Sequence, residues 1–251
     1  MGPPHKVMDS RPRRLGGVLG GMGPVATVDF LRKVIALTQA TSDQEHVPLI
    51  VHQVPQIPDR SGAIAQNSDA PVAPMLEGLR RLADAGAEYA VIPCNTAHHW
   101  YPILADAQPL RLLHIADAVE AELQLRNRST DRLALLGTRG LLRSGFYADR
   151  LKPRGARFVT ISEPLQTLVD LAIEAVKSGN SPSATKHARI AVQEAQRSGA
   201  EIVVLACTEL PVALAECAVL EDCIDSTLAL ARSCVVHSFA GDSCPVAGAE
   251  I

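Results

Sequence analysis

The chain has 251 residues, of which 47% are hydrophobic, 20% charged and 3% aromatic, and its formal net charge is −3. This length suits one large or two ordinary globular domains, and the nearly balanced charge argues against a nucleic-acid partner. No apolar run reaches the roughly 18 residues of a membrane span, and the first residues lack the apolar core of a secretory signal. The six cysteines have no CxxC spacing, which is typical of reduced thiols in a cytoplasmic protein.

The first half of the chain shows strands alternating with helices after a loose leader over residues 1–13. Apolar runs predict strands at 15–19, 48–54, 89–92 and 111–115. Helical spacing predicts helices at 25–38, 76–85 and 96–107, and another that ends near 125. A glycine-rich turn (20–24) follows the first strand, and a proline-punctuated loop is expected over 55–62.

The same order restarts after a polar linker at 127–131. Strands are predicted at 132–136, 156–160 and 202–205, and helices at 141–151, 163–177, 184–198 and about 226–237, before a loose tail. The alternation predicts parallel βαβ units and an α/β fold. The repeat predicts two similar domains with mainly parallel sheets flanked by helices, related by a pseudo-twofold axis.

The expected domain boundaries follow from this repeat. The N-terminal domain is predicted over 14–126 and the C-terminal domain over 127–225, with the helix at about 226–238 packing back on the first. Ligands of such sheets bind beyond the carboxyl ends of the strands, so we expect the active site in the cleft between the domains.

Two matching segments end in a cysteine. Gly86-Ala87-Glu88 leads through an apolar run to Cys94, and Gly199-Ala200-Glu201 leads at the same spacing to Cys207. A single buried cysteine is usually core, whereas a repeated pair at strand ends suggests two thiols that face one another. A thiol, with a pKa near 8.5, can serve as acid or base near neutral pH. Two such groups on opposite faces of one carbon are what inversion of a stereocentre needs.

The residues around the cysteines suit a small anionic ligand. Asn95, Thr96 and Thr208 are placed to bind a carboxylate beside backbone N–H groups, although both threonines could simply cap helices. The turn that contains Met22 is expected to expose further backbone N–H groups. No motif indicates pyridoxal phosphate or another cofactor. Cys94 and His98 have the spacing of a helical metal pair, but a zinc site needs more ligands, so no metal is predicted.

Four ordered motifs together resemble the cofactor-independent aspartate/glutamate racemase family, over roughly residues 14 to 236. They are Gly20–Thr27, Pro58-Asp59-Arg60, Pro93–His98 and Cys207–Pro211. The resemblance implies two-base catalysis by Cys94 and Cys207. Glutamate racemases of cell-wall synthesis usually carry Cys-Thr-His at the second cysteine, whereas Cys207-Thr208-Glu209 is similar to the aspartate-racemase branch.

That branch implies further roles. Arg60 matches a substrate-carboxylate arginine, and Lys177 matches a lysine from the second domain, so the two would hold an amino acid with two carboxylates. Thr138 is expected in the site, and Glu209 is expected to orient its loop without acting as a general base. Leu141 stands near a position where many relatives carry threonine, which leaves side-chain specificity open. The family expectation is a homodimer.

The resulting hypothesis is a cytoplasmic racemase that uses neither a metal nor pyridoxal phosphate and whose expected substrate is aspartate. Glutamate or another amino acid remains an alternative substrate. A maleate or hydantoin-type isomerase of the same superfamily is a second reading, and a non-catalytic amino-acid-binding protein is a third.

Overall fold

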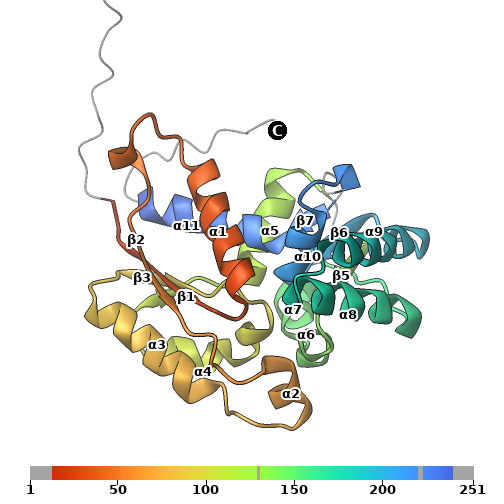
Figure 1. Cartoon of the computed structure of the whole chain (residues 1–251), viewed down its shortest axis with the longest axis horizontal. Coiled ribbons are helices and arrows are strands. Elements are labelled where there is room, and N and C mark those ends of the chain that lie inside the picture. Colours follow the sequence, from red (N-terminus) through yellow and green to blue (C-terminus); the bar gives the residue numbers. More distant parts are fainter. Residues whose placement is uncertain (1–12, 129–130, 220–222, 240–251) are drawn as a thin grey trace, which may run out of the picture.

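The computed structural model describes residues 13–128, 131–219 and 223–239. It confirms an α/β fold in which helices flank two parallel sheets (Figure 1). The strands are β1 (Gly16–Gly20), β2 (Leu49–Gln53), β3 (Tyr89–Val91), β4 (Arg111–Leu112), β5 (Leu133–Leu136), β6 (Ile202–Leu205) and β7 (Cys223–Asp225). The helices are α1 (Pro24–Leu37), α2 (Arg60–Ala65), α3 (Val72–Asp84), α4 (Tyr101–Asp106), α5 (Ile115–Leu125), α6 (Arg139–Ser144), α7 (Phe146–Leu151), α8 (Glu163–Lys177), α9 (Ser181–Arg197), α10 (Glu209–Leu214) and α11 (Ser226–Phe239). Short 3-10 helices are η1 (Asp43–Glu45), η2 (Thr96–Trp100) and η3 (Lys152–Arg154).

Three strands of the larger sheet, β1-β3-β4, have the same order as the three strands of the smaller one, and this is the structural counterpart of the sequence repeat. One sheet runs β2-β1-β3-β4 and the other β5-β6-β7, all pairs being parallel. In each, the strand that enters a glycine turn pairs with the strand that enters a cysteine loop, with Val18 opposite Val91 and Leu136 opposite Leu205. The glycine turn and the cysteine loop therefore leave the same edge of each sheet.

The last helix, α11, lies against the first half of the chain. It packs on α1 and α5 (Figure 1). Between the helices, the buried carboxylate of Glu122 in α5 accepts from Arg126 Nε at 2.8 Å and from Arg232 Nε of α11 at 2.9 Å. The domain boundaries at 126 and 225 stay a prediction. Residues 129–130 of the expected linker lie outside the described residues, as do most of the expected leader and tail.

Several helix predictions need correction. The helix expected over 141–151 is two helices, because Gly145 adopts a left-handed conformation with φ of 70° between α6 and α7. The helix expected over 96–107 begins as the 3-10 helix η2, and α4 follows with a proline in its first turn. The strand expected over 156–160 is wrong, since this segment makes only a single bridge, from Phe158 to Leu133.

Three short elements were not predicted. Helix α2 lies where a loop was expected, and Asp59 caps it by accepting from the Gly62 N–H at 2.5 Å. Helix α10 and strand β7 follow Cys207, and both are too short for their periodicity to be recognised.

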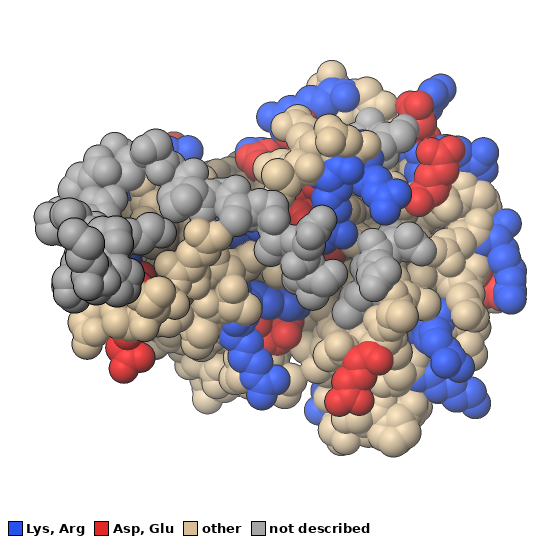
Figure 2. All heavy atoms as spheres, turned by 90° about the horizontal axis from the view of Figure 1, so that it is seen from above, with Lys and Arg blue, Asp and Glu red and all other residues tan. Residues whose placement is uncertain are grey.

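The surface carries charges of both signs. On the face seen in Figure 2, Lys and Arg side chains are interspersed with Asp and Glu side chains, so the two signs offset each other there. Among the described residues, no helix combines the length and apolar character needed to cross a membrane.

Candidate active site

One pocket collects the residues that the sequence singled out, from loops of both halves of the chain. Its lining consists of Met22, Asp59, Arg60, Ser61, Cys94, Asn95, Thr96, Thr138, Lys177, Cys207, Thr208 and Glu209. All ten predicted site residues are in this set. The structure thus brings the glycine turns and both cysteine loops to one space.

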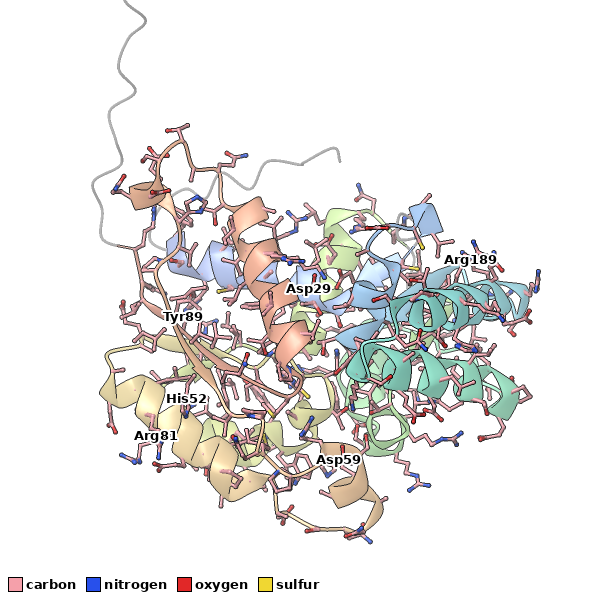
Figure 3. The ribbon with its side chains drawn as sticks, in the orientation of Figure 1. Asp29, His52, Asp59, Arg81, Tyr89 and Arg189 are labelled. Carbon is pink, nitrogen blue, oxygen red and sulfur yellow. The ribbon has the colours of Figure 1, made fainter. Side chains whose placement is uncertain are left out.

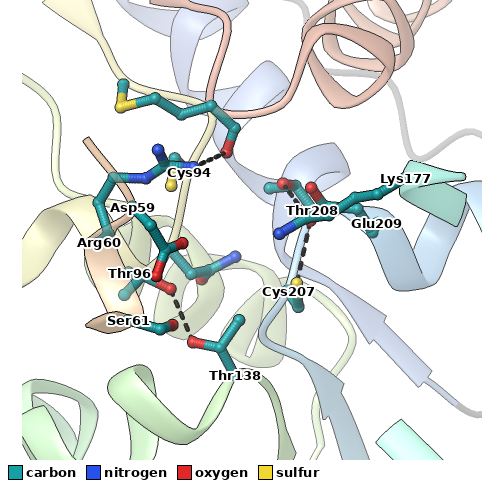
Figure 4. A pocket seen from close by; sticks show the side chains of 12 residues that line it. Asp59, Arg60, Ser61, Cys94, Thr96, Thr138, Lys177, Cys207, Thr208 and Glu209 are labelled. Carbon is teal, nitrogen blue, oxygen red and sulfur yellow. Dashed lines mark hydrogen bonds between the residues drawn. The ribbon is translucent and has the colours of Figure 1, made fainter. Parts of the chain in front are cut away.

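The two cysteines lie on opposite sides of that space, with Arg60 on the Cys94 side and Lys177 and Glu209 on the Cys207 side (Figure 4). Each thiol is buried, with 5% of the residue exposed. The strands β3 and β6 end just before them, so the backbone of each sheet fixes its own cysteine.

Cys94 has a cationic neighbour. Burial raises the pKa of its thiol, while the positive charge of Arg60 and the backbone N–H of Ala97 oppose that rise. These two groups stabilise the thiolate. The environment of Cys94 therefore favours the deprotonated form more than burial alone would allow.

Cys207 has an anionic neighbour. Its Sγ–H donates to Glu209 Oε2 at 3.0 Å, and the Thr208 hydroxyl donates to the same oxygen at 3.3 Å. Burial first, and then the charge and hydrogen bond of Glu209, raise the pKa of Cys207 well above its ordinary value, against a smaller opposing effect of Lys177. In the empty site Cys207 is accordingly the protonated thiol.

Arg60 is held at the pocket by backbone carbonyls. Its Nη1 donates to Ile57 O and Pro58 O, each at 3.1 Å, and its Nη2 donates to Met22 O at 3.3 Å (Figure 4). Within the described part of the chain, the buried Nε has no hydrogen-bond partner. The guanidinium is thus fixed at the pocket, where its positive charge acts on the Cys94 thiol.

Two threonines join the halves of the chain across the pocket. The hydroxyls of Thr96 and Thr138 lie 2.8 Å apart. Thr138 also caps α6, since its Oγ1 accepts from the Leu141 N–H at 3.1 Å. The side chain of Leu141 itself packs in the core and does not line the pocket, so its leucine does not meet a ligand there directly.

Some lining residues lacked an assigned role in the sequence reasoning. Asp59 and Ser61 flank Arg60 and could have been found from the Pro58-Asp59-Arg60 motif. The partners behind Asn95, namely Tyr147 and Ser226, have no local signal because they come from distant parts of the chain. Among the residues that the structure describes, no cluster of three metal-ligating side chains is found; His98 instead bonds through Nδ1 to the Cys94 carbonyl at 2.9 Å.

Comparison with known proteins places this chain in a family. The model of the Asp/Glu/Hydantoin racemase family matches residues 19–234. The broad specificity amino-acid racemase RacX of Bacillus subtilis is 28% identical over 223 residues, covering 87% of this chain and 96% of its own. The aspartate racemase of Picrophilus torridus superposes with a TM-score of 0.80 at 30% identity, covering 90% of this chain and 94% of its own.

A more distant relative shares the fold alone. The glutamate racemase of Francisella tularensis superposes with a TM-score of 0.62 at 14% identity, over 89% of this chain and 80% of its own. The family match spans nearly the whole described chain and includes both cysteine loops. The chain therefore belongs to the Asp/Glu/Hydantoin racemase family and is an isomerase of that family.

Proposed function

We propose that this protein racemises aspartate, with Cys94 and Cys207 as its paired acid and base. The observation that carries the proposal is the placement of two buried thiols on opposite sides of one pocket that also holds Arg60 and Lys177. The likeness to an aspartate racemase supports the substrate. Two cations suit an amino acid with two carboxylates, because each can bind one.

The proposed reaction needs only proton transfers. One cysteine, as thiolate, takes the proton from Cα; the electron pair delocalises onto the α-carboxylate, and the opposite thiol protonates the other face of Cα. The first cysteine ends as a thiol and the second as a thiolate, ready for the reverse direction. Burial raises the pKa of both thiols, but Arg60 opposes that rise at Cys94 whereas Glu209 adds to it at Cys207, so Cys94 is the more readily deprotonated of the two and Cys207 is the thiol bonded to Glu209.

The remaining lining residues bind the substrate in this proposal. Asn95, Thr96, Thr138 and Thr208 offer polar side chains, and Met22 belongs to the glycine turn that closes the pocket. Fixed donors at the α-carboxylate stabilise the charge that develops when the proton leaves. The proposed activity uses neither a metal nor pyridoxal phosphate.

The deciding experiment is incubation with L-aspartate in D₂O without added cofactor, followed by NMR and chiral chromatography. We expect deuterium at Cα together with D-aspartate. Cys94→Ser and Cys207→Ser should each lower racemisation by at least roughly a thousandfold, since acid–base groups contribute that order of rate. Cys217→Ser is the control, because Cys217 is a partly exposed free thiol outside the pocket. Full racemisation by Cys94→Ser would contradict the two-base mechanism.

A second candidate is racemisation of a wider range of amino acids. It is favoured by the likeness to a broad specificity amino-acid racemase. The same D₂O assay on a panel of amino acids separates the two, because strict aspartate specificity leaves the other α-hydrogens unexchanged.

We further propose that the protein works as a cytoplasmic homodimer. The exposed side chains of Val25, Val28 and Ile35 lie on one face of α1 and form an apolar surface that a second copy of the chain could cover. The compartment is argued from the cysteines, because the free thiols Cys94, Cys207, Cys217 and Cys234 suit a reducing environment. Light scattering coupled to size-exclusion chromatography measures the oligomeric state, and a monomeric mass would contradict the dimer.

A further inference from the structure

Tyr147 links helix α7 to the loop that carries Cys94. Its hydroxyl donates to Asn95 Oδ1 at 2.7 Å, and both residues are 2% exposed. A tyrosine hydroxyl this deeply buried needs a partner, and this one has a side chain that lines the pocket.

Ser226 lies on the other side of the same amide and fixes its orientation. The Ser226 hydroxyl lies 2.7 Å from the Leu205 carbonyl, which can only accept, so its single hydrogen points there. The serine oxygen must therefore accept from Asn95, whose Nδ2 lies 2.9 Å away. This places the amide nitrogen toward Ser226 and leaves Oδ1 for Tyr147.

One group of the Asn95 side chain stays available. Nδ2 has two N–H bonds, of which one goes to Ser226 and the other has no acceptor within the described part of the chain. Because Asn95 lines the pocket, that second N–H is the donor it offers to a ligand.

We propose that Tyr147 and Ser226 are positioning residues that hold the Asn95 amide so that this N–H donates to the α-carboxylate of the substrate. The inference rests on the proposed racemisation and adds two residues to it. Negative charge grows on that carboxylate as the Cα proton leaves, so a preorganised donor stabilises the transition state more than the bound substrate.

The same chain of bonds connects the two cysteine loops. Leu205 is the last residue of β6 and stands two positions before Cys207. Asn95 directly follows Cys94. The path from Tyr147 through Asn95 and Ser226 to Leu205 therefore ties the strand end of one cysteine to the loop of the other.

The test compares two buried tyrosines. Tyr147→Phe removes the hydroxyl that orients Asn95, whereas Tyr89→Phe removes an equally buried hydroxyl, which donates to Cys234 O at 3.1 Å. Tyr89 lies in the four-stranded sheet, away from the labelled pocket residue Asp59 (Figure 3). Turnover is measured with the amino acid that the wild type racemises fastest.

We expect Tyr147→Phe and Ser226→Ala each to lower kcat roughly tenfold with KM changed by no more than about twofold, while Tyr89→Phe keeps the wild-type kcat. The double variant Tyr147→Phe/Ser226→Ala should fall little below either single variant, because both act through Asn95. If Tyr147→Phe does not fold, Ser226→Ala carries the test alone.

Other results would overturn the inference. A Tyr147→Phe enzyme with the kcat of Tyr89→Phe would show that the hydroxyl only stabilises the fold. Independent, multiplying losses in the double variant would show that the two residues do not share Asn95. Failure of the proposed function is distinguished from these results by the D₂O assay, in which the wild type itself would then exchange no α-hydrogen.

Discussion

Cys94 and Cys207 occupy matched positions in the repeat, yet their neighbours carry opposite charges. Arg60 stabilises a thiolate at Cys94, and Glu209 stabilises a thiol at Cys207. The symmetry of the backbone therefore does not extend to the electrostatics. The proposed mechanism needs one thiol and one thiolate at the start of each turnover, and this asymmetry makes Cys94 the more readily deprotonated of the two.

Glu209→Gln is expected to lower the pKa of the Cys207 thiol, because it removes the negative charge that opposes the thiolate. The measurement is a pH titration of the ultraviolet absorbance of the thiolate in a Cys94→Ser background. We expect the midpoint to move down, because the charge and the hydrogen bond of Glu209 both hold it up. Glu194→Gln, a glutamate in α9 that pairs with Arg197 outside the pocket, is the matched control. An unchanged midpoint in Glu209→Gln would contradict the assigned role of Glu209.

At the scale of elements, helix α2 closes one wall of the pocket by packing on α6. A Cβ placed on Gly140 of α6 would lie 2.7 Å from Ser61 Cα in α2. Such a contact with backbone cannot be relieved by a side-chain rotation. Glycine at this position therefore sets how closely Arg60, the neighbour of Ser61, approaches the pocket.

Gly140→Ala is expected to push α2 outward and to raise KM for the substrate roughly tenfold, with a loss of about 1–3 kcal/mol in the free energy of unfolding. Steady-state kinetics and denaturant unfolding measure the two effects. The control is Gly78→Ala in α3, where a Cβ would lie 2.5 Å from Leu19 Cδ1, so that the core is crowded away from the residues that line the pocket. Equal KM values for the two variants would show that the contact with α6 does not position Arg60.

Some elements could be predicted from the sequence alone and others could not. The apolar runs before Cys94 and Cys207 predict β3 and β6, and their repeat predicts the shared pocket, because strand ends of parallel sheets are fixed by local patterning. Helix α2 could not be found this way, since a six-residue helix held by the Asp59 cap has too little periodicity. The contacts of Asn95 with Tyr147 and Ser226 depend on tertiary packing between distant segments, on which no local pattern reports.

At the scale of the whole molecule, one apolar cluster spans both halves of the chain. It includes Val18 and Tyr89 of the first sheet, Leu133 and Val204 of the second, and Leu230 of α11. Opening the pocket by separating the sheets would expose this cluster to water, at a cost that grows with the apolar area uncovered. The shared core therefore holds the two halves of the chain together around the pocket.

His98 and His114 form a buried pair that makes the free energy of unfolding depend on pH. The rings of His98 and His114 are 4.9 Å apart, and Tyr101, Phe146 and the charge of Arg150 face them. Burial lowers the pKa of His98 to about 4 and that of His114 to about 2. The hydrogen bonds also disfavour a second proton on either ring. His98 Nε2 has no acceptor among the described residues, and His114 Nδ1 already accepts from the Ala116 N–H.

The sign of the effect follows from these two shifts. Above pH 6.5 neither the folded nor the unfolded histidines bind a proton, so the free energy of unfolding does not depend on them. Below pH 6.5 the histidines bind protons in the unfolded chain but not in the folded one. The free energy of unfolding therefore falls by about 1.4 kcal/mol per pH unit for each histidine. For His98 this continues until its folded form titrates near pH 4, a loss of about 3 kcal/mol.

Denaturant unfolding of the wild type between pH 7 and pH 4 should therefore show a steep loss of stability, and His98→Gln should make that loss shallower by about one proton's slope. Glutamine removes the titrating ring at this position while keeping an amide N–H that can donate to the Cys94 carbonyl. His99→Gln is the control, because the neighbouring His99 is exposed and should leave the wild-type slope unchanged. Parallel curves for wild type and His98→Gln would contradict the assignment, since they would place the proton uptake on other groups.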